Sequence, residues 1–376
     1  MKKISLVCLL SVTILVYGYP QKQTEEIVTG QYRSFSSNIL GGDITYLVRL
    51  PEGYDKGKRK YPVLYLMNAQ MTSTLSIAVG ILENLEFEMV PSMILVGISN
   101  TGKAEKFFPI QPDGKSDQAD TFLRFLNEEL IPFIDRQYRT EDYRILTGQS
   151  NAALFVLYAL FSQPDSFNAY FAFSPSLGWG LDFMKEKAAS FSSRRDQSSQ
   201  YLYMNQGGRD YPELVIEPMK KFVETLKKLS VQGFGWELDR LDRDGHVPVS
   251  SLNYGLLSLF PDFYATNDLK NKGLKAVDKH YKKLTQRYGF HIEAPEEVLF
   301  HMSYTLQQNK NYEKAVDMFK ELIYRYPGSF LAHFYLGRTY EELGEMKSAE
   351  KYFIKTLELN PDFQPAKNKL QMIRKK

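Results

Sequence analysis

The sequence has a single cysteine, Cys8, among 376 residues, and it lies close to the N-terminus. With no second cysteine the chain cannot form an internal disulfide, and beyond Cys8 it offers no thiolate nucleophile and no thiolate metal ligand. The net charge is only +3, and no long basic run lies beside stacking aromatic side chains. Nucleic acid is therefore not an expected partner.

Histidine is also scarce, with 5 in the whole chain, and only His246 falls within residues 1–264. Without histidine pairs at ligand spacing, that part of the chain gives no sign of a metal site. No glycine-rich phosphate loop follows a predicted strand. We therefore expect neither a metal nor another cofactor.

The N-terminus resembles a targeting segment. Two lysines precede an apolar run over residues 4–16, which is too short to span a membrane comfortably. Residues 1–18 are interpreted as a signal peptide, with a cleavage site fitting at Val16-Tyr17-Gly18; an uncleaved anchor is the alternative. Cleavage predicts an exported bacterial protein, periplasmic or extracellular, with no stable membrane span.

Residues 27–264 alternate between apolar runs of strand length and segments with helical spacing. Continuous apolar runs are typical of parallel strands buried on both faces. The alternation predicts right-handed crossovers and a mostly parallel sheet flanked by helices, an α/β domain. The expected strands are 61–67, 93–99, 167–173, 200–204 and 236–241, after an antiparallel pair at 33–38 and 44–50, and the expected helices include 121–138 and 212–229.

Residues 143–160 join a short strand to an apolar run of helical length through the sequence GQSNA at 148–152. A sharp strand-to-helix turn of this kind is a nucleophile elbow, which lifts a serine hydroxyl clear of the sheet. The small residues Gly148 and Ala152 suit the close approach of strand and helix. Ser150 is therefore the candidate nucleophile, although a serine at such a turn can also be only a helix N-cap.

A serine hydroxyl is a poor nucleophile at neutral pH unless a base accepts its proton. His246 is the candidate base, because it is the lone histidine of the predicted sheet domain and follows the last predicted strand. A carboxylate that orients the imidazole is expected in the loop after strand 200–204. Asp210 is the first choice and Glu213 the second, and a dyad without an acid stays open.

An oxyanion formed during attack requires two backbone N–H donors. The first is expected from Asn151, the residue after the serine, and the second from the loop after the third strand. Gln70 is the expected donor in that loop.

From residue 295 the pattern changes to a repeat. Ala315 and Phe319 recur 34 positions later as Ala349 and Phe353, which is the tetratricopeptide signature. Two repeats and a capping helix are fewer than the roughly three repeats usually needed for independent stability. Residues 295–376 are therefore expected to dock on the sheet domain or to bind a protein partner, with a plain helical tail as the alternative. The lysine-rich residues 265–294 show no strong period and are interpreted as a linker.

Together these features resemble the esterase D-like branch of the α/β-hydrolases, which includes enterochelin esterases, S-formylglutathione hydrolases and feruloyl esterases. The resemblance covers roughly residues 30–264. It is carried by the segments 61–66, 129–135, 138–140, 148–150, 164–167, 174–176 and 244–246. It implies an α/β-hydrolase fold, Ser150 and His246 as catalytic residues, and an acid near Asp210. The chain departs from the family at two places. At Asn68-Ala69 the family usually has Asp-Gly, and alanine has fewer backbone conformations available than glycine. At 103–109 the family usually has an arginine-rich run.

The leading hypothesis is an exported serine esterase that hydrolyses a small-molecule carboxylic ester through an acyl-enzyme on Ser150. The alternative is a catalytically silent hydrolase-fold protein that recruits a partner through its repeats, and the departures at Asn68-Ala69 and 103–109 support it. The sequence leaves the acyl group and the alcohol of the substrate open.

Overall fold

The computed structural model describes residues 30–374 except 70–71, 87, 100–116 and 195–197. The predicted signal peptide at 1–18 and the run at 103–109 lie outside these described residues. In the described part of the chain, no helix is both long and apolar enough to cross a membrane.

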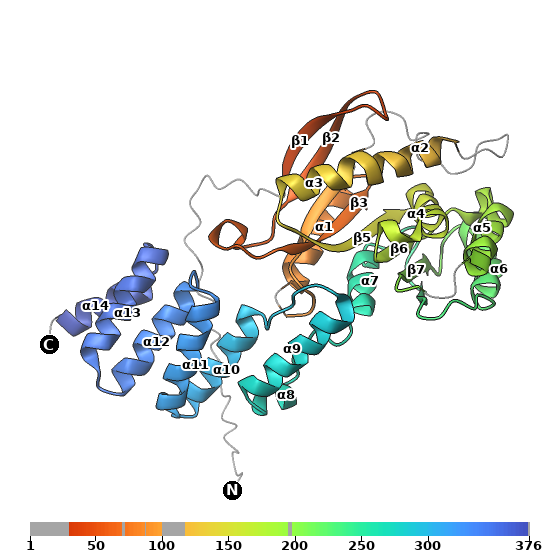
Figure 1. The fold of residues 1–376 in the computed structure, drawn as a ribbon. Coiled ribbons are helices and arrows are strands. Elements are labelled where there is room, and N and C mark those ends of the chain that lie inside the picture. The colour runs from red at the N-terminus through yellow and green to blue at the C-terminus, as the bar shows by residue number, and fades with distance from the viewer. Residues whose placement is uncertain (1–29, 70–71, 87, 100–116, 195–197, 375–376) are drawn as a thin grey trace, which may run out of the picture.

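One sheet of eight strands forms the centre of the body, in the order β1-β2-β4-β3-β5-β6-β7-β8 (Figure 1). β3 to β8 are parallel, and β1 and β2 form an antiparallel hairpin at one edge. The strands are β1 (Gln31–Ser37), β2 (Gly42–Arg49), β3 (Tyr61–Met67), β4 (Ile94–Ile98), β5 (Thr140–Gln149), β6 (Ala169–Phe173), β7 (Tyr201–Gly207) and β8 (Gly235–Leu241). Each expected strand is present, and the α/β-hydrolase fold is confirmed.

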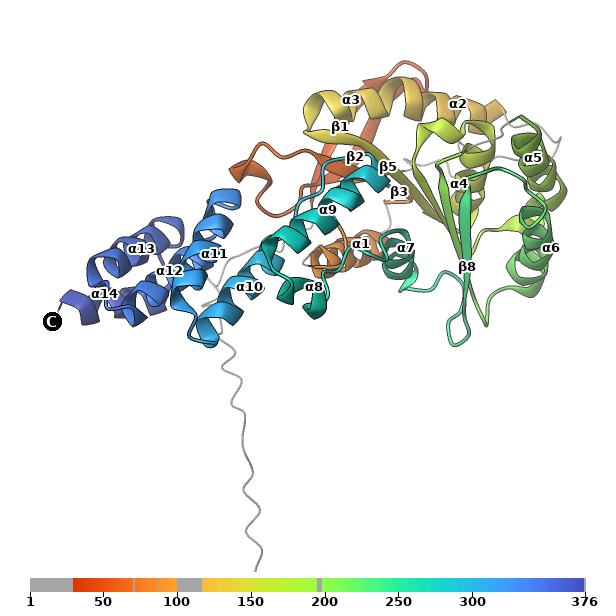
Figure 2. The ribbon, with the colours of Figure 1, turned by 60° about the horizontal axis from the view of Figure 1, so that its bottom comes forward.

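Helices cover both faces of the sheet, and every residue of β3 and β4 is buried for that reason. Figure 2 shows α2 (Asp117–Phe125) and α3 (Ile131–Gln137) on one side, and α1 (Thr72–Leu85) and α7 (Ser251–Leu259) on the other. With α2 and α3, the helices α4 (Asn151–Ser162), α5 (Leu181–Arg194) and α6 (Glu217–Leu226) enclose one apolar core, while α1 and α7 enclose a second.

The helix expected over 121–138 is built from two pieces. α2 and α3 are joined by a π-helical turn at Leu126–Leu130, so the chain stays helical between them. A second π-helical turn, Pro212–Ile216, leads into α6 in the same way. Shorter helical turns lie at Tyr54–Lys56, Pro164–Ser166 and Leu177–Trp179.

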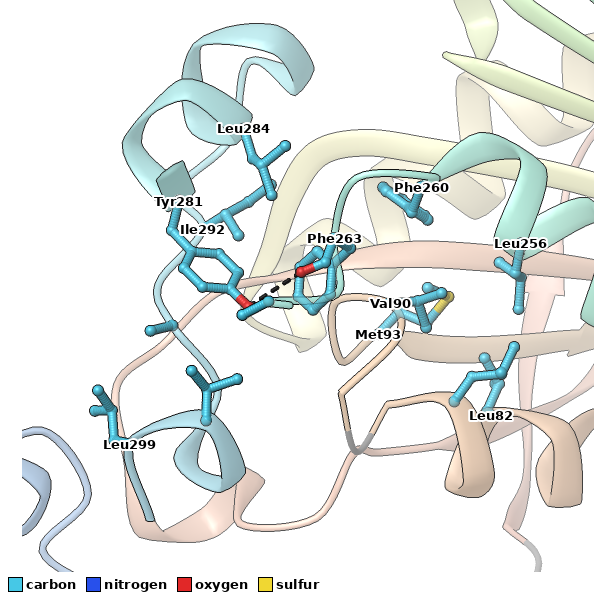
Figure 3. Packing of buried hydrophobic residues seen from close by; sticks show 14 of the residues in the cluster. Leu82, Val90, Met93, Leu256, Phe260, Phe263, Tyr281, Leu284, Ile292 and Leu299 are labelled. Atoms are coloured by element: carbon cyan, nitrogen blue, oxygen red, sulfur yellow. Dashed lines mark hydrogen bonds between the residues drawn. The ribbon is translucent and has the colours of Figure 1, made fainter. Parts of the chain in front are cut away.

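The segment interpreted as a linker is a packed joint. It contains α8 (Asn267–Asn271) and α9 (Leu274–Tyr288), and α9 buries Tyr281, whose hydroxyl donates a hydrogen bond to the Phe263 carbonyl at 3.0 Å. Figure 3 shows this contact among apolar side chains that come from both the body and the helical region. The second apolar core therefore continues through the joint into the C-terminal helices.

Five helices follow the joint: α10 (Glu296–Gln308), α11 (Tyr312–Arg325), α12 (Phe330–Glu342), α13 (Met346–Leu359) and α14 (Gln364–Arg374). Figure 1 shows them extending away from the sheet. The repeated positions Ala315, Phe319, Ala349 and Phe353 are all fully buried. A Cβ at Gly337 would lie 2.8 Å from the Phe353 ring, so glycine allows α12 and α13 to pack closely. The tetratricopeptide prediction is confirmed.

Arg59, in the loop before β3, connects the body to the helical region. Its Nη2 lies 3.0 Å from Glu293 Oε2 and 3.1 Å from the Tyr326 hydroxyl. The guanidinium also lies over the Tyr326 ring, 5.1 Å from its centroid. The first repeat is therefore in direct contact with the hydrolase body.

Glu297, at the start of α10, makes the stability of this region depend on pH. Burial, together with the nearby Glu296, Glu88 and Glu52, raises the pKa of Glu297 to about 7 from 4.5. A carboxyl group with a raised folded-state pKa holds its proton after the unfolded chain has released its own. The free energy of unfolding therefore falls as the pH rises between these two values.

Glu297→Gln removes this ionisation. We expect it to raise the free energy of unfolding by about 1–2 kcal/mol at pH 8, and by much less at pH 5. Urea unfolding at the two pH values measures the difference. An equal gain at both values would contradict the prediction.

Candidate active site

Ser150 lies on a sharp turn between β5 and α4, with φ 56° and ψ −118°. A non-glycine residue with positive φ is strained, and the surrounding structure must hold it there. The Ser150 N–H donates to the Phe173 carbonyl at 2.9 Å. A Cβ at Gly148 would lie 2.8 Å from the Ala152 carbonyl, so a larger residue would force strand and helix apart. The local geometry is that of a nucleophile elbow.

Ser150, His246 and Asp210 form a hydrogen-bonded row. Ser150 Oγ lies 2.9 Å from His246 Nε2, and His246 Nδ1 lies 2.8 Å from Asp210 Oδ1. The Asp210 side chain is 0% exposed and that of His246 is 24% exposed. The three residues follow β5, β7 and β8, which are parallel and therefore end at one edge of the sheet.

The environment of Asp210 favours its ionised form. Burial alone would raise the pKa of Asp210, but hydrogen bonds from His246, Ser174 and the Tyr211 N–H bring it below its ordinary value. A carboxylate in this position holds the imidazole in one tautomer and stabilises the imidazolium. Glu213, the alternative acid, has an exposed side chain outside this hydrogen-bonded row. The geometry favours Asp210.

Two buried serines at the end of β6 complete the surroundings. Ser176 Oγ lies 3.2 Å from Ser150 Oγ, and Ser174 Oγ accepts a hydrogen bond from the Val247 N–H at 3.1 Å. Because the Ser174 hydroxyl also contacts Asp210, it connects the acid to the loop that carries His246. Residues 174–176 are recognisable in the sequence as a Ser-Pro-Ser segment, but these contacts arise only because β6 lies between β5 and β7 in the sheet.

Of the two expected oxyanion donors, only Asn151 is described. It is the first residue of α4, where backbone N–H groups have no carbonyl partner within the helix. Gln70 lies outside the described residues. The positive φ of 61° in the adjoining loop belongs to Asn68, a residue type that tolerates it. Ala69 is fully buried and lies against Gly97, so the departure at Asn68-Ala69 fits the backbone.

The row of Ser150, His246 and Asp210 can transfer protons and present a nucleophile. Nε2 of His246 can take the serine proton, and the Asp210 carboxylate can stabilise the charge that results. Among the described residues, no three metal-binding side chains converge on a common point. The expectation that the chain needs no metal or other cofactor stays a prediction.

Gly207, the last residue of β7, lies directly against the loop that precedes His246. A Cβ at this position would lie 2.0 Å from the Gly245 carbonyl oxygen and 2.5 Å from that of Asp244. We expect Gly207→Ala to displace the loop and to lower kcat/KM about 100-fold, because the imidazole loses its alignment.

The matched control for Gly207→Ala is Gly80→Ala on α1, where an added Cβ meets nothing within 4 Å. Ester hydrolysis is compared for both variants, with circular dichroism to confirm that each is folded. Activity of a folded Gly207→Ala protein within about threefold of the parent would contradict the proposed contact with the histidine loop.

Comparison with known proteins gives three family matches. The family described as "Putative esterase" matches residues 37–228, and two tetratricopeptide families match 297–329 and 330–363. The ferri-bacillibactin esterase BesA of Bacillus subtilis is 29% identical over 215 residues, which cover 50% of this chain and 74% of that protein. The siderophore enterobactin esterase of Emericella nidulans is 38% identical over 93 residues, which cover 23% of this chain and 31% of that protein.

Among solved structures, an IroE-like serine hydrolase from Shewanella oneidensis has a TM-score of 0.65 at 24% identity, and the match covers 79% of this chain and 99% of that one. At this identity the likeness shows the fold alone. The esterase match, in contrast, spans just over half of the 376 residues. The chain therefore belongs to the "Putative esterase" family of ester hydrolases, with tetratricopeptide repeats added at its C-terminal end.

Proposed function

We propose that this protein is an exported serine esterase with Ser150 as its nucleophile. Ser150 Oγ attacks the carbonyl carbon of a carboxylic ester while His246 Nε2 takes the hydroxyl proton. The observation that carries the proposal is the row of hydrogen bonds, 2.9 Å and 2.8 Å long, that starts at a strained elbow. Asp210 holds the imidazole in the orientation that this transfer requires.

The protonated His246 then gives its proton to the leaving alcohol, and an acyl-enzyme remains on Ser150. Water, deprotonated by the same histidine, attacks the acyl group; the bond from the acyl carbon to Ser150 Oγ breaks, His246 returns its proton to Oγ, and the carboxylic acid is released. The N–H of Asn151, the first residue of α4, is proposed as one donor to the oxyanion in both steps, and Gln70 is proposed as the second.

The substrate is proposed to be a small-molecule ester. Two of the matched proteins are named as siderophore esterases, which makes siderophore esters the first class to test. Export is supported by the two lysines and the apolar run of residues 4–16. The contacts of Arg59 with Glu293 and Tyr326 place the repeats against the body, which leaves their other surfaces for a protein partner.

Hydrolysis of a panel of short p-nitrophenyl esters and siderophore esters by the purified chain tests the proposal. We expect turnover of the p-nitrophenyl esters and covalent inactivation by a fluorophosphonate, because only an activated serine reacts with such a reagent. A catalytically silent scaffold would show neither result and would still bind a partner through its repeats.

A further inference from the structure

A cavity of about 250 Å³ lies between the sheet and helices α1 and α7, near the candidate active site. Its walls come from the segments that carry the site. Gly148 and Gln149 precede Ser150, and residues 247–249 follow His246. The first turns of α1, which follow the loop expected to hold the oxyanion, close the opposite side. We infer that this cavity is a specificity pocket that receives a compact, largely apolar group of the ester substrate, and this inference rests on the proposed function.

The cavity has a deep end and an open end. Leu66 and Thr147, which pair across β3 and β5, lie at the deep end, together with the buried Ala78 of α1. Val249 is 68% exposed and lies at the open end. Gln149 donates a hydrogen bond from Nε2 to Thr74 Oγ1 at 3.0 Å, which joins the end of β5 to the first turn of α1. A group entering at Val249 would therefore start beside the residues that flank the nucleophile and the base.

The size and the walls of the cavity define what fits. A dry cavity of about 150 Å³ is large enough to bind benzene, so this one holds a substituted ring or a short branched chain. Most of the lining residues are apolar, among them Leu66, Phe173, Val247 and Leu252. Burying an apolar group against them would contribute to binding in proportion to the area removed from water.

One buried side-chain oxygen of the lining, that of Thr147, has no hydrogen-bond partner among the described residues. Thr147 is 0% exposed, and its hydroxyl makes no hydrogen bond within the described part of the chain. The other buried hydroxyl of the lining is already used, because Ser251 donates to the Pro248 carbonyl and accepts from Asn205 Nδ2. A buried hydroxyl without a partner is uncommon in native proteins and calls for a ligand or an ordered water. The preferred group therefore carries one hydrogen-bonding atom, such as an ether oxygen, where it meets Thr147.

The test fills the cavity and follows substrate selectivity. Ala78→Leu extends a larger side chain into the deep end, and Ser76→Leu adds the same side chain at an exposed position of the same helix. Two ester series are measured on the full chain: p-nitrophenyl esters with acyl groups from acetate to hexanoate and benzoate, and acetates of alcohols from methanol to benzyl alcohol. The first series varies the acyl group and the second varies the alcohol.

We expect Ala78→Leu to lower kcat/KM for the larger members of one series, relative to its smallest member, by about 10- to 100-fold. Ser76→Leu should leave that ratio within about twofold. A loss that grows along the acyl series assigns the cavity to the acyl group, and a loss that grows along the alcohol series assigns it to the alcohol. A uniform change across both series, or no change, overturns the inference.

Thr147→Val keeps the shape of the side chain and removes the hydroxyl, so it tests the same pocket if Ala78→Leu fails to fold. The substrates are matched pairs that differ by one ether oxygen: butyrate against methoxyacetate esters, and butyl acetate against 2-methoxyethyl acetate. In one of these pairs we expect selectivity to shift toward the all-carbon member by about 3- to 10-fold. Unchanged selectivity in both pairs overturns the role of Thr147, and it overturns the pocket as well if Ala78→Leu does not fold. If the parent chain hydrolyses no ester at all, the proposed function fails and the inference falls with it; turnover with unchanged selectivity in both variants defeats the inference alone.

Discussion

Ser150→Ala should lower kcat/KM for a short p-nitrophenyl ester by about 10⁵- to 10⁶-fold, because no other group in the row can form the acyl-enzyme. The residual rate comes from the oxyanion donors and from substrate binding, which the mutation leaves in place. The measurement is a steady-state assay with circular dichroism to confirm folding. The substitution removes the hydroxyl that contacts His246 and adds no larger group, so the fold should be retained.

The matched control is Ser176→Ala. Its hydroxyl lies 3.2 Å from that of Ser150, whereas the hydrogen bonds of the imidazole within the described part of the chain go to Ser150 and Asp210. Because Ser176 contributes packing and one weak hydrogen bond, Ser176→Ala should lower kcat/KM by no more than about tenfold. A folded Ser150→Ala protein that keeps most of its turnover would show that the elbow is not the site of reaction.

Asp210→Asn should lower kcat by about 10⁴-fold with a small change in KM. An amide N–H at position 210 would donate to Nδ1 of His246, which moves the ring proton to Nε2. In that tautomer Nε2 cannot accept the serine proton. The effect is therefore on the chemical step, and the buried side chain of Asp210 keeps its shape.

Glu213→Gln serves as the control for this prediction, because Glu213 was the alternative acid and is exposed. Its kcat should stay within about twofold of the parent value. A large loss for Glu213→Gln with little loss for Asp210→Asn would reverse the assignment of the acid. Similar small losses for both variants would favour a dyad of Ser150 and His246.

The sequence predicted the sheet because its strands are buried on both faces and so appear as continuous apolar runs. It also predicted Ser150 and His246 as candidates, the first from the small residues around the elbow and the second because histidine is scarce, and the structure brings their side chains to 2.9 Å. The choice between Asp210 and Glu213 stayed open from the sequence. Both lie in one loop, and which carboxylate can contact the imidazole of His246 depends on backbone packing. In the structure His246 Nδ1 lies 2.8 Å from Asp210 Oδ1, a proximity that depends on how the two loops pack and that no sequence pattern encodes.

The joint at 265–294 was harder to interpret from the sequence. Val277, Tyr281 and Leu284 lie at helical spacing on α9, but the surrounding lysines mask this pattern. The apolar face is recognisable only beside its partner surface, which includes Phe263 and side chains of α1 and α7. The cavity near Thr147 was equally hidden, because its walls come from strands, helices and a loop that are distant in the chain.

Peptide mapping after reaction with a fluorophosphonate tests the central claim most directly. The account predicts a single adduct, on Ser150, that forms in the parent chain and is almost absent in His246→Ala. Equally fast labelling of His246→Ala and of the parent chain would contradict the account. So would an adduct on a residue other than Ser150 in a preparation that hydrolyses esters.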